Sequence, residues 1–397
     1  MLKLNHLSKS LIILLAAVSA LGPSSMQILL PALPIIRSTY TVSSEVAQLT
    51  LSLSMLAIAI GTLFFGPMSD KYGRKPIMLI GLCITIVGSI ACWLANSIEW
   101  LIVGRFIQAF GGAVGLVLAR AIVRDVYGAE EAARVIATLV MVMVVLPMLS
   151  PALGGELIAR FGFHSVFIVT AIMCVFILVF LSYQLPETLE EPVPFEGVQA
   201  MILTYFSLFK SRIFCGYAFC VTFVSVVFFS FIAAAPEIMV SVLKRPATEY
   251  GYYFIIIPAG FMTGNYVARH FNKALGLDRL IALGAGIGVT GICLALLLLG
   301  FNQPLALFLP IALATFGNGI TLPNAQAAAI NEFPKLAGSA SGLTGFLQMG
   351  FSAVAAQFVA VIYNGTVYPL LLLMLGASIA SLLFFRWGLA NKGKTVS

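Results

Sequence analysis

Long apolar runs alternate with short polar turns along the whole chain. Twelve of these runs approach the ~20 residues that an α-helix needs to cross a bilayer. The pattern therefore predicts an all-α polytopic membrane protein whose twelve spans cover residues 11–30, 46–65, 77–95, 100–122, 133–159, 165–185, 213–240, 250–268, 280–300, 305–322, 337–363 and 367–385.

The longest polar stretch, residues 184–212, divides these spans into six plus six. Such a division is typical of two pseudo-symmetric repeats joined by a linker. We predict an N-terminal six-helix bundle at residues 1–185 and a cytoplasmic linker at 186–212. A C-terminal six-helix bundle with a short cytoplasmic tail follows at 213–397.

The distribution of basic residues predicts the orientation of the chain in the membrane. The chain is 60% hydrophobic and 9% charged, far below the ~25% of charged residues in a soluble domain. Seventeen basic residues lie on the side of the termini and four on the opposite side, so both termini are predicted to be cytoplasmic. The basic residues form no patch, which argues against nucleic acid as a partner despite a net charge of +7. The six cysteines form no C-x-x-C pair, so we predict neither metal nor cofactor.

A dense charged segment, residues 66–75, follows the second predicted span. It carries Gly66, Asp70, Gly73 and Arg74. Charges between two such apolar runs predict a turn at the cytoplasmic membrane surface. One interpretation is an ordinary positive-inside loop. The pattern G-x-x-x-D-x-x-G-R-K also resembles the cytoplasmic signature between the second and third helices of major facilitator superfamily transporters.

The fourth span carries Arg105 and Gln108 near its start, and Arg124 and Asp125 beyond its end. A lone arginine at membrane depth either snorkels to the interface or faces a partner or an aqueous cavity. The R-x-x-Q spacing resembles the span-four signature of proton-coupled facilitators, which implies a coupling or cavity role. The resemblance also implies that Arg124 and Asp125 act with residues 66–75 to latch the cytoplasmic gate; local anchoring is the alternative.

The fifth span contains Pro151, Gly154 and Gly155, a P-x-x-G-G pattern that resembles the span-five signature of drug/proton antiporters. Ser150 replaces the usual glycine before the proline. Two prolines in this span predict a bend. The resemblance implies export.

The end of the first span, including Met26 and Gln27, resembles the bicyclomycin/chloramphenicol-resistance (Bcr/CflA) branch of that superfamily. This family has an acidic residue where Gln27 stands, and glutamine cannot carry a proton. Glu156 is a substitute candidate, with an exposed residue at the outer mouth as the alternative reading. Polar and aromatic residues at membrane depth either line a cavity or bond helix to helix. The candidate cavity and coupling residues are Gln27, Arg105, Gln108, Asn318, Gln348, Tyr217, Phe228, Met26 and Glu156.

No span contains a nucleophile–base pair or paired carboxylates, so an enzyme is not expected. A sensor built on a transporter fold would append a soluble tail, and the predicted one is short. The resemblance implies an inner-membrane exporter of small amphiphilic molecules, and we expect the chain to be a monomer. Its expected partners are a small-molecule substrate, protons and the lipid bilayer, and an uncoupled or differently coupled facilitator is the alternative because of Gln27.

Overall fold

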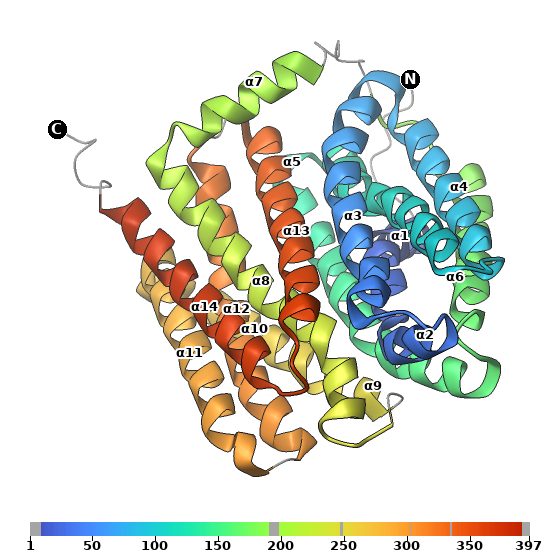
Figure 1. Cartoon of the computed structure of the whole chain (residues 1–397). Helices are drawn as coiled ribbons and strands as arrows, with labels where there is room; N and C mark the ends of the chain where they lie inside the picture. Colours follow the sequence, from blue (N-terminus) through green and yellow to red (C-terminus); the bar gives the residue numbers. More distant parts are fainter. Residues whose placement is uncertain (1–8, 190–197, 247–248, 302, 334–335, 391–397) are drawn as a thin grey trace. The chain divides into compact units, whose positions relative to one another are not determined.

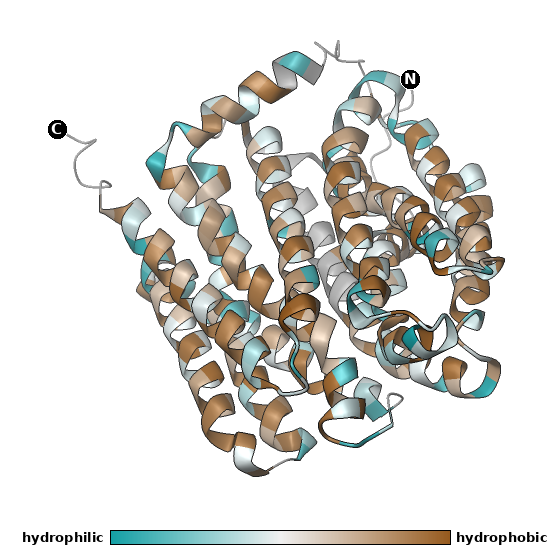
Figure 2. Ribbon diagram, in the orientation of Figure 1, coloured by the Kyte–Doolittle hydropathy of each residue, from teal (hydrophilic) through white to brown (hydrophobic). Residues whose placement is uncertain are grey.

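The computed structural model describes residues 9–189, 198–246, 249–301, 303–333 and 336–390, and every regular element among them is a helix (Figure 1). Helices suit this composition, because a bilayer holds no water for backbone N–H and C=O groups and a helix pairs them internally. Apolar residues cover most of the length of the helices (Figure 2). By its internal contacts the chain divides into two compact units, Met1–Phe195 and Glu196–Ser397.

The first unit is built around one long helix that packs on three of its neighbours, α1, α3 and α4. That helix is α5. The elements of this unit are α1 (Lys9–Gln27), η1 (Leu30–Ala32), α2 (Leu33–Thr39), α3 (Ser44–Tyr72), α4 (Arg74–Trp93), α5 (Ile98–Phe161) and α6 (Ser165–Gln184).

Helix α5 must fold back on itself. If it were straight, Gly115 and Gly154 would lie about 58 Å apart. Both instead pack beside the first span, Gly115 on Val18 and Gly154 on Ile28, only about 15 Å apart along a helix. Its two ends therefore correspond to the predicted fourth and fifth spans, although the turn expected between them is helical. The connecting A-E-E-A-A-R sequence contains strong helix formers, which explains the difference.

The first span is broken, whereas the sequence predicted a single helix over residues 11–30. Helix α1 ends at Gln27, and the chain continues through η1 and α2. Pro31 and Pro34 each lie at the start of one of these short elements. A proline has no N–H and disfavours helix at the residue before it, so the prolines restart the chain instead of extending α1. The Ser24 carbonyl still accepts the N–H of Ile28 at 2.9 Å, whereas the carbonyls that follow it at the end of α1 lack a continuing helix to supply donors.

The second unit repeats the arrangement of the first. Helix α12 packs on α8, α10 and α11 as α5 packs on α1, α3 and α4. Its elements are α7 (Val198–Phe209), α8 (Arg212–Ser241), α9 (Tyr250–Phe254), α10 (Ile256–Leu275), α11 (Leu277–Leu298), η3 (Leu299–Phe301), α12 (Pro304–Asn331), α13 (Ala337–Ile362) and α14 (Tyr368–Leu389). Helix α7 lies inside the predicted linker and packs on α8 and α13. It was missed because its 12 residues are too few for a span.

Ten helices among the described residues are long and apolar enough to cross a membrane. The predicted spans at 133–159 and 250–268 are not among them. The first overlaps residues whose side chains fall outside the described part of the chain. The second corresponds to α9 and α10, and α10 carries Asn265, Arg269 and His270 within its 20 residues, which lowers its hydropathy.

Candidate functional site

The charged segment at residues 66–75 is mostly helix, not the turn predicted from its charges. Helix α3 continues through Asp70 to Tyr72, and only Gly73 separates it from α4. The 29 residues of α3 extend about 44 Å, well beyond the ~30 Å hydrocarbon core, so its charged end can remain helical in water. Gly73 adopts φ 102°, a backbone conformation that glycine tolerates and other residues avoid.

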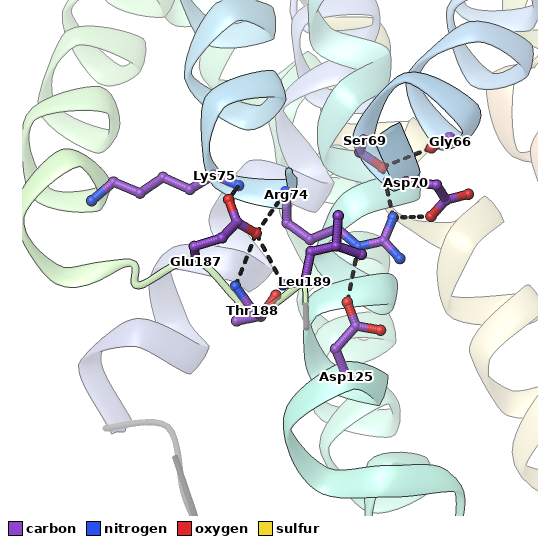
Figure 3. Close-up of polar contacts among 9 residues, drawn as sticks. All are labelled: Gly66, Ser69, Asp70, Arg74, Lys75, Asp125, Glu187, Thr188 and Leu189. Atoms are coloured by element: carbon purple, nitrogen blue, oxygen red, sulfur yellow. Dashed lines mark hydrogen bonds and ion pairs between the residues drawn. The ribbon is translucent and has the colours of Figure 1, made fainter. Parts of the chain in front are cut away.

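Arg74 is the centre of a compact polar cluster (Figure 3). Its side chain is only 6% exposed and forms ion pairs with Asp70 and Asp125. Nε donates to Asp125 Oδ2 at 2.9 Å, and Nη1 donates to Ser69 Oγ at 2.7 Å. A buried guanidinium needs such partners, because an unpaired charge away from water is costly. The cluster joins the end of α3, the start of α4 and the middle of α5.

Glu187 holds the start of α4, a contact that the sequence analysis missed. One carboxylate oxygen accepts the backbone N–H groups of Arg74 at 2.8 Å, Thr188 at 2.9 Å and Leu189 at 3.0 Å (Figure 3). The other accepts the N–H of Lys75 at 3.2 Å. The first N–H groups of a helix need acceptors and favour a negative charge, and Gly73 has no side chain to supply one.

Lys75 extends the same connection to the end of α6. Its Nζ donates to the carbonyl oxygen of Ser182 at 2.9 Å. Carbonyls in the last turn of a helix lack intrahelical donors, and a cation there is favoured by the helix dipole. Residues 74 and 75 therefore contact both the end of α6 and the segment after it that contains Glu187.

Arg124 does not take part in this cluster. Its side chain is exposed, and within the described residues it has no ion pair or hydrogen bond. Of the predicted Arg124/Asp125 pair, the structure brings only Asp125 to residues 66–75. Gly66 lies one helical turn before Ser69 in α3, and its carbonyl oxygen accepts a hydrogen bond from the hydroxyl of Ser69 at 2.8 Å.

Arg105 is buried in the first unit, so the interpretation that it snorkels to the interface is wrong. It is 1% exposed. Its Nη1 donates to the carbonyl oxygen of Ser25 at 3.1 Å and to Oε1 of Gln108. Gln108 in turn donates to Ser89 Oγ at 2.7 Å. The Ser25 carbonyl belongs to the last turn of α1, where a cation interacts favourably with the helix dipole.

Met26 and Gln27 lie at the break that ends α1. Both are buried, at 2% and 6% exposure. The side-chain oxygen of Gln27 has no hydrogen-bond donor among the described residues. The break thus places buried polar groups within two residues of the carbonyl that binds Arg105.

The P-x-x-G-G segment of α5 lies against the same end of the first span. A Cβ atom at Gly154 would collide with the carbonyl oxygen of Ile28, so only glycine permits this contact. Pro151 and Gly155 are buried beside it. The hydroxyl of Ser150 donates to the carbonyl of Leu146 at 2.8 Å.

An apolar cavity of about 430 Å³ is lined by residues of this part of α5 together with residues of α1 and α6. Glu156 lines the cavity, but its carboxylate is 49% exposed and pairs with Arg160 at 3.2 Å. This position agrees with the reading of Glu156 as an exposed residue.

The remaining predicted cavity residues lie in the second unit. Asn318 on α12 is 5% exposed, and its Nδ2 has no acceptor among the described residues. Tyr217 donates to Asp278 Oδ1 at 2.6 Å and packs on Phe385. Phe228 on α8 packs edge to face on its neighbour Phe229, and Gln348 on α13 is half-buried. Tyr217 is thus part of a packed core, whereas Asn318 has unused hydrogen-bonding capacity.

Comparisons with known proteins give a consistent family. Residues 13–356 match the Major Facilitator Superfamily. The chain is 27% identical over 380 residues to the bicyclomycin resistance protein homolog of Haemophilus influenzae, covering 94% of each chain. It is 27% identical over 362 residues to multidrug resistance protein D of Escherichia coli, covering 89% of each. The solved D-xylose-proton symporter has a TM-score of 0.76 at 14% identity, over 94% of this chain and 97% of that one.

The family match covers most of the chain, and the bacterial relatives cover nearly all of it. The likeness to the symporter concerns the fold alone, which agrees with the repeated helix packing of the two units. This multi-pass bacterial membrane protein belongs to the Major Facilitator Superfamily of transporters.

Proposed function

We propose that the chain exports small amphiphilic molecules across the bacterial inner membrane, either drugs or a secreted metabolite such as a siderophore. The proton gradient drives this export. The observation that carries the proposal is the packing of the Gly154 segment on the break in the first span. That segment resembles the span-five signature of drug/proton antiporters, and two relatives are named as resistance proteins.

Alternating access is the mechanism that suits two repeats. The six-helix bundles at residues 1–185 and 213–397 rock about a midplane site, with residues 186–212 as a cytoplasmic linker and both termini cytoplasmic. The chain acts as a monomer, with no cofactor and no enzymatic activity. Arg74, Asp70 and Asp125 hold the cytoplasmic end of the first bundle as one body, which supports a gating role for this cluster.

A second candidate is an uncoupled or differently coupled facilitator. Gln27 is neutral where the Bcr/CflA family has an acid, and Glu156 is exposed and paired with Arg160. Neither residue therefore offers a buried carboxylate that could carry protons. This observation favours the uncoupled or differently coupled facilitator.

Everted membrane vesicles from a pump-deficient host separate the two candidates. We expect at least one compound from a panel of dyes, phenicols and siderophores to accumulate in vesicles that contain the chain and to leave when the pH gradient is collapsed. Vesicles without the chain are the control. Accumulation that ignores the pH gradient would favour a differently coupled transporter, and chain-dependent equilibration without accumulation would favour an uncoupled facilitator. No chain-dependent uptake of any compound would contradict export.

A further inference from the structure

Arg105 is a buried cation without a described counter-ion. It is 1% exposed, and guanidinium groups keep their charge in proteins. A buried charge is costly unless an opposite charge or several hydrogen bonds compensate it. Arg74 and Arg160 form ion pairs with carboxylates, whereas Arg105 forms none with any described residue.

The two edges of this guanidinium are used differently. Nη1 is bound by the Ser25 carbonyl and by Gln108. Nε and Nη2 have no acceptor among the described residues. These two atoms form the side edge of the guanidinium, whose parallel N–H groups match the two oxygens of a carboxylate. The unused edge is thus shaped for one particular kind of partner.

The surrounding protein supplies little negative charge. Gln27 is neutral, and the end of α1 contributes only the partial charge of its carbonyl groups, about half an elementary charge. Gln108 fixes the orientation of the arginine, because its own amide is held by Ser89. The guanidinium is therefore oriented but not neutralised.

We propose that the side edge of Arg105 binds the carboxylate of an organic anion, and that amphiphilic carboxylates are the substrate class of this transporter. The proposal rests on the proposed transport function. It also agrees with the neutral Gln27, which follows the Ser25 carbonyl by two residues and adds no negative charge to this end of α1. For this substrate class the differently coupled candidate applies, because a monoanion is driven outward by an inside-negative membrane potential and its export needs no protonatable residue at position 27.

The test compares carboxylates with their uncharged amides. Purified full-length protein in lipid nanodiscs is melted with benzoate, hippurate or octanoate and with benzamide, hippuramide or octanamide, all at one ionic strength set by sodium chloride. We expect at least one carboxylate to raise the melting temperature while its amide does not, because ligands stabilise the folded state that binds them. Arg105→Gln should abolish this difference, and Arg105→Lys should reduce it because lysine lacks the bidentate edge.

Arg160→Gln is the matched control, because Arg160 is an exposed arginine on the same helix. It should keep the difference between carboxylate and amide. Arg105→Gln removes a buried charge together with two hydrogen bonds, so each ligand effect is measured relative to the ligand-free melting temperature of the same variant. No carboxylate preference in the whole panel, or a preference that survives Arg105→Gln, would overturn the proposal.

Vesicle transport then separates this proposal from the proposed function. Export of neutral amphiphiles by a chain that shows no carboxylate preference would leave the function standing and remove the anion site. Carboxylate binding that depends on Arg105, in a chain that moves no compound, would keep the site and contradict the exporter.

Discussion

Two buried arginines of the first unit have opposite surroundings. Arg74 is enclosed by Asp70, Asp125 and Ser69, so its charge is compensated within the protein. Arg105 is held by two neutral acceptors on one edge only. The first arrangement favours a fixed local structure, and the second favours a mobile anionic partner. We therefore infer a structural role for Arg74 and a binding role for Arg105.

The two acids that flank Arg74 should differ in their effect on stability. The side chain of Asp70 is 44% exposed, and an ion pair this exposed contributes at most about 1 kcal/mol. Asp125 accepts the Nε hydrogen bond of Arg74, whose own side chain is 6% exposed. We expect Asp125→Asn to lower the melting temperature of the purified protein more than Asp70→Asn does.

Export should fall in both variants, because each releases Arg74 from the gating cluster. Vesicle accumulation per unit of membrane-inserted protein measures this effect. Asp70→Asn is the sharper case, since the protein should stay in the membrane with little loss of stability. Unchanged export by that variant would remove the proposed latch role of the cluster.

Helix α4 depends on another part of the chain for its first turn. Glu187 accepts two of its N–H groups, and Lys75 binds the last turn of α6. The exchange of contacts is reciprocal: the segment after α6 caps α4, and the start of α4 caps α6. The start of α4 and the end of α6, far apart in the sequence, are therefore fastened to each other.

Glu187→Ala should destabilise the first unit by about 0.5–2 kcal/mol, the usual effect of losing a helix cap. Glu187→Gln keeps an acceptor but loses the charge, so we expect a smaller loss. Thermal melting of both variants, beside Glu99→Gln as an exposed acid in the first turn of α5, measures the difference. Equal melting temperatures for the alanine and wild-type proteins would contradict the capping role.

Periodicity and charge sufficed to predict the helical class and most spans, because long apolar runs have few alternatives in a bilayer. The break after Gln27 was missed although Pro31 and Pro34 signalled it, since the run stays apolar across the break. The contact of Glu187 was missed because it joins residues far apart in the sequence, and the uncapped Gly73 was the available clue to it. The orientation of Arg105 depends on Ser25 and Gln108 together, and only the folded chain brings the first of these near.

At the scale of the whole molecule, the distribution of basic residues predicts which ends of the helices face the cytoplasm. Lys71 at the end of α3 and Asn96 before α5 are both exposed and should lie on opposite sides of the membrane. A membrane-impermeant maleimide added to spheroplasts should label Asn96→Cys and not Lys71→Cys, in a variant that lacks the native cysteines. The reverse labelling would invert the proposed topology.

The energetics of an anionic substrate also concern the whole molecule. Moving one charge across a membrane potential changes its free energy by about 2.3 kcal/mol per 100 mV. That amount supports a concentration ratio on the order of fifty, since each 1.4 kcal/mol is about tenfold. Export at this ratio requires no proton to be carried, which agrees with the neutral Gln27.

The reciprocal capping of α4 and α6 determines where the protein can be divided into two separately expressed polypeptides. If the two halves were made as separate polypeptides, a cut upstream of Glu187 would deprive the first polypeptide of the acceptor for α4. A cut after Leu189 would keep that acceptor and both of its local N–H donors in the same polypeptide. To keep the capping contacts intact, a division into two polypeptides should therefore be made after Leu189, several residues beyond the predicted span at 165–185.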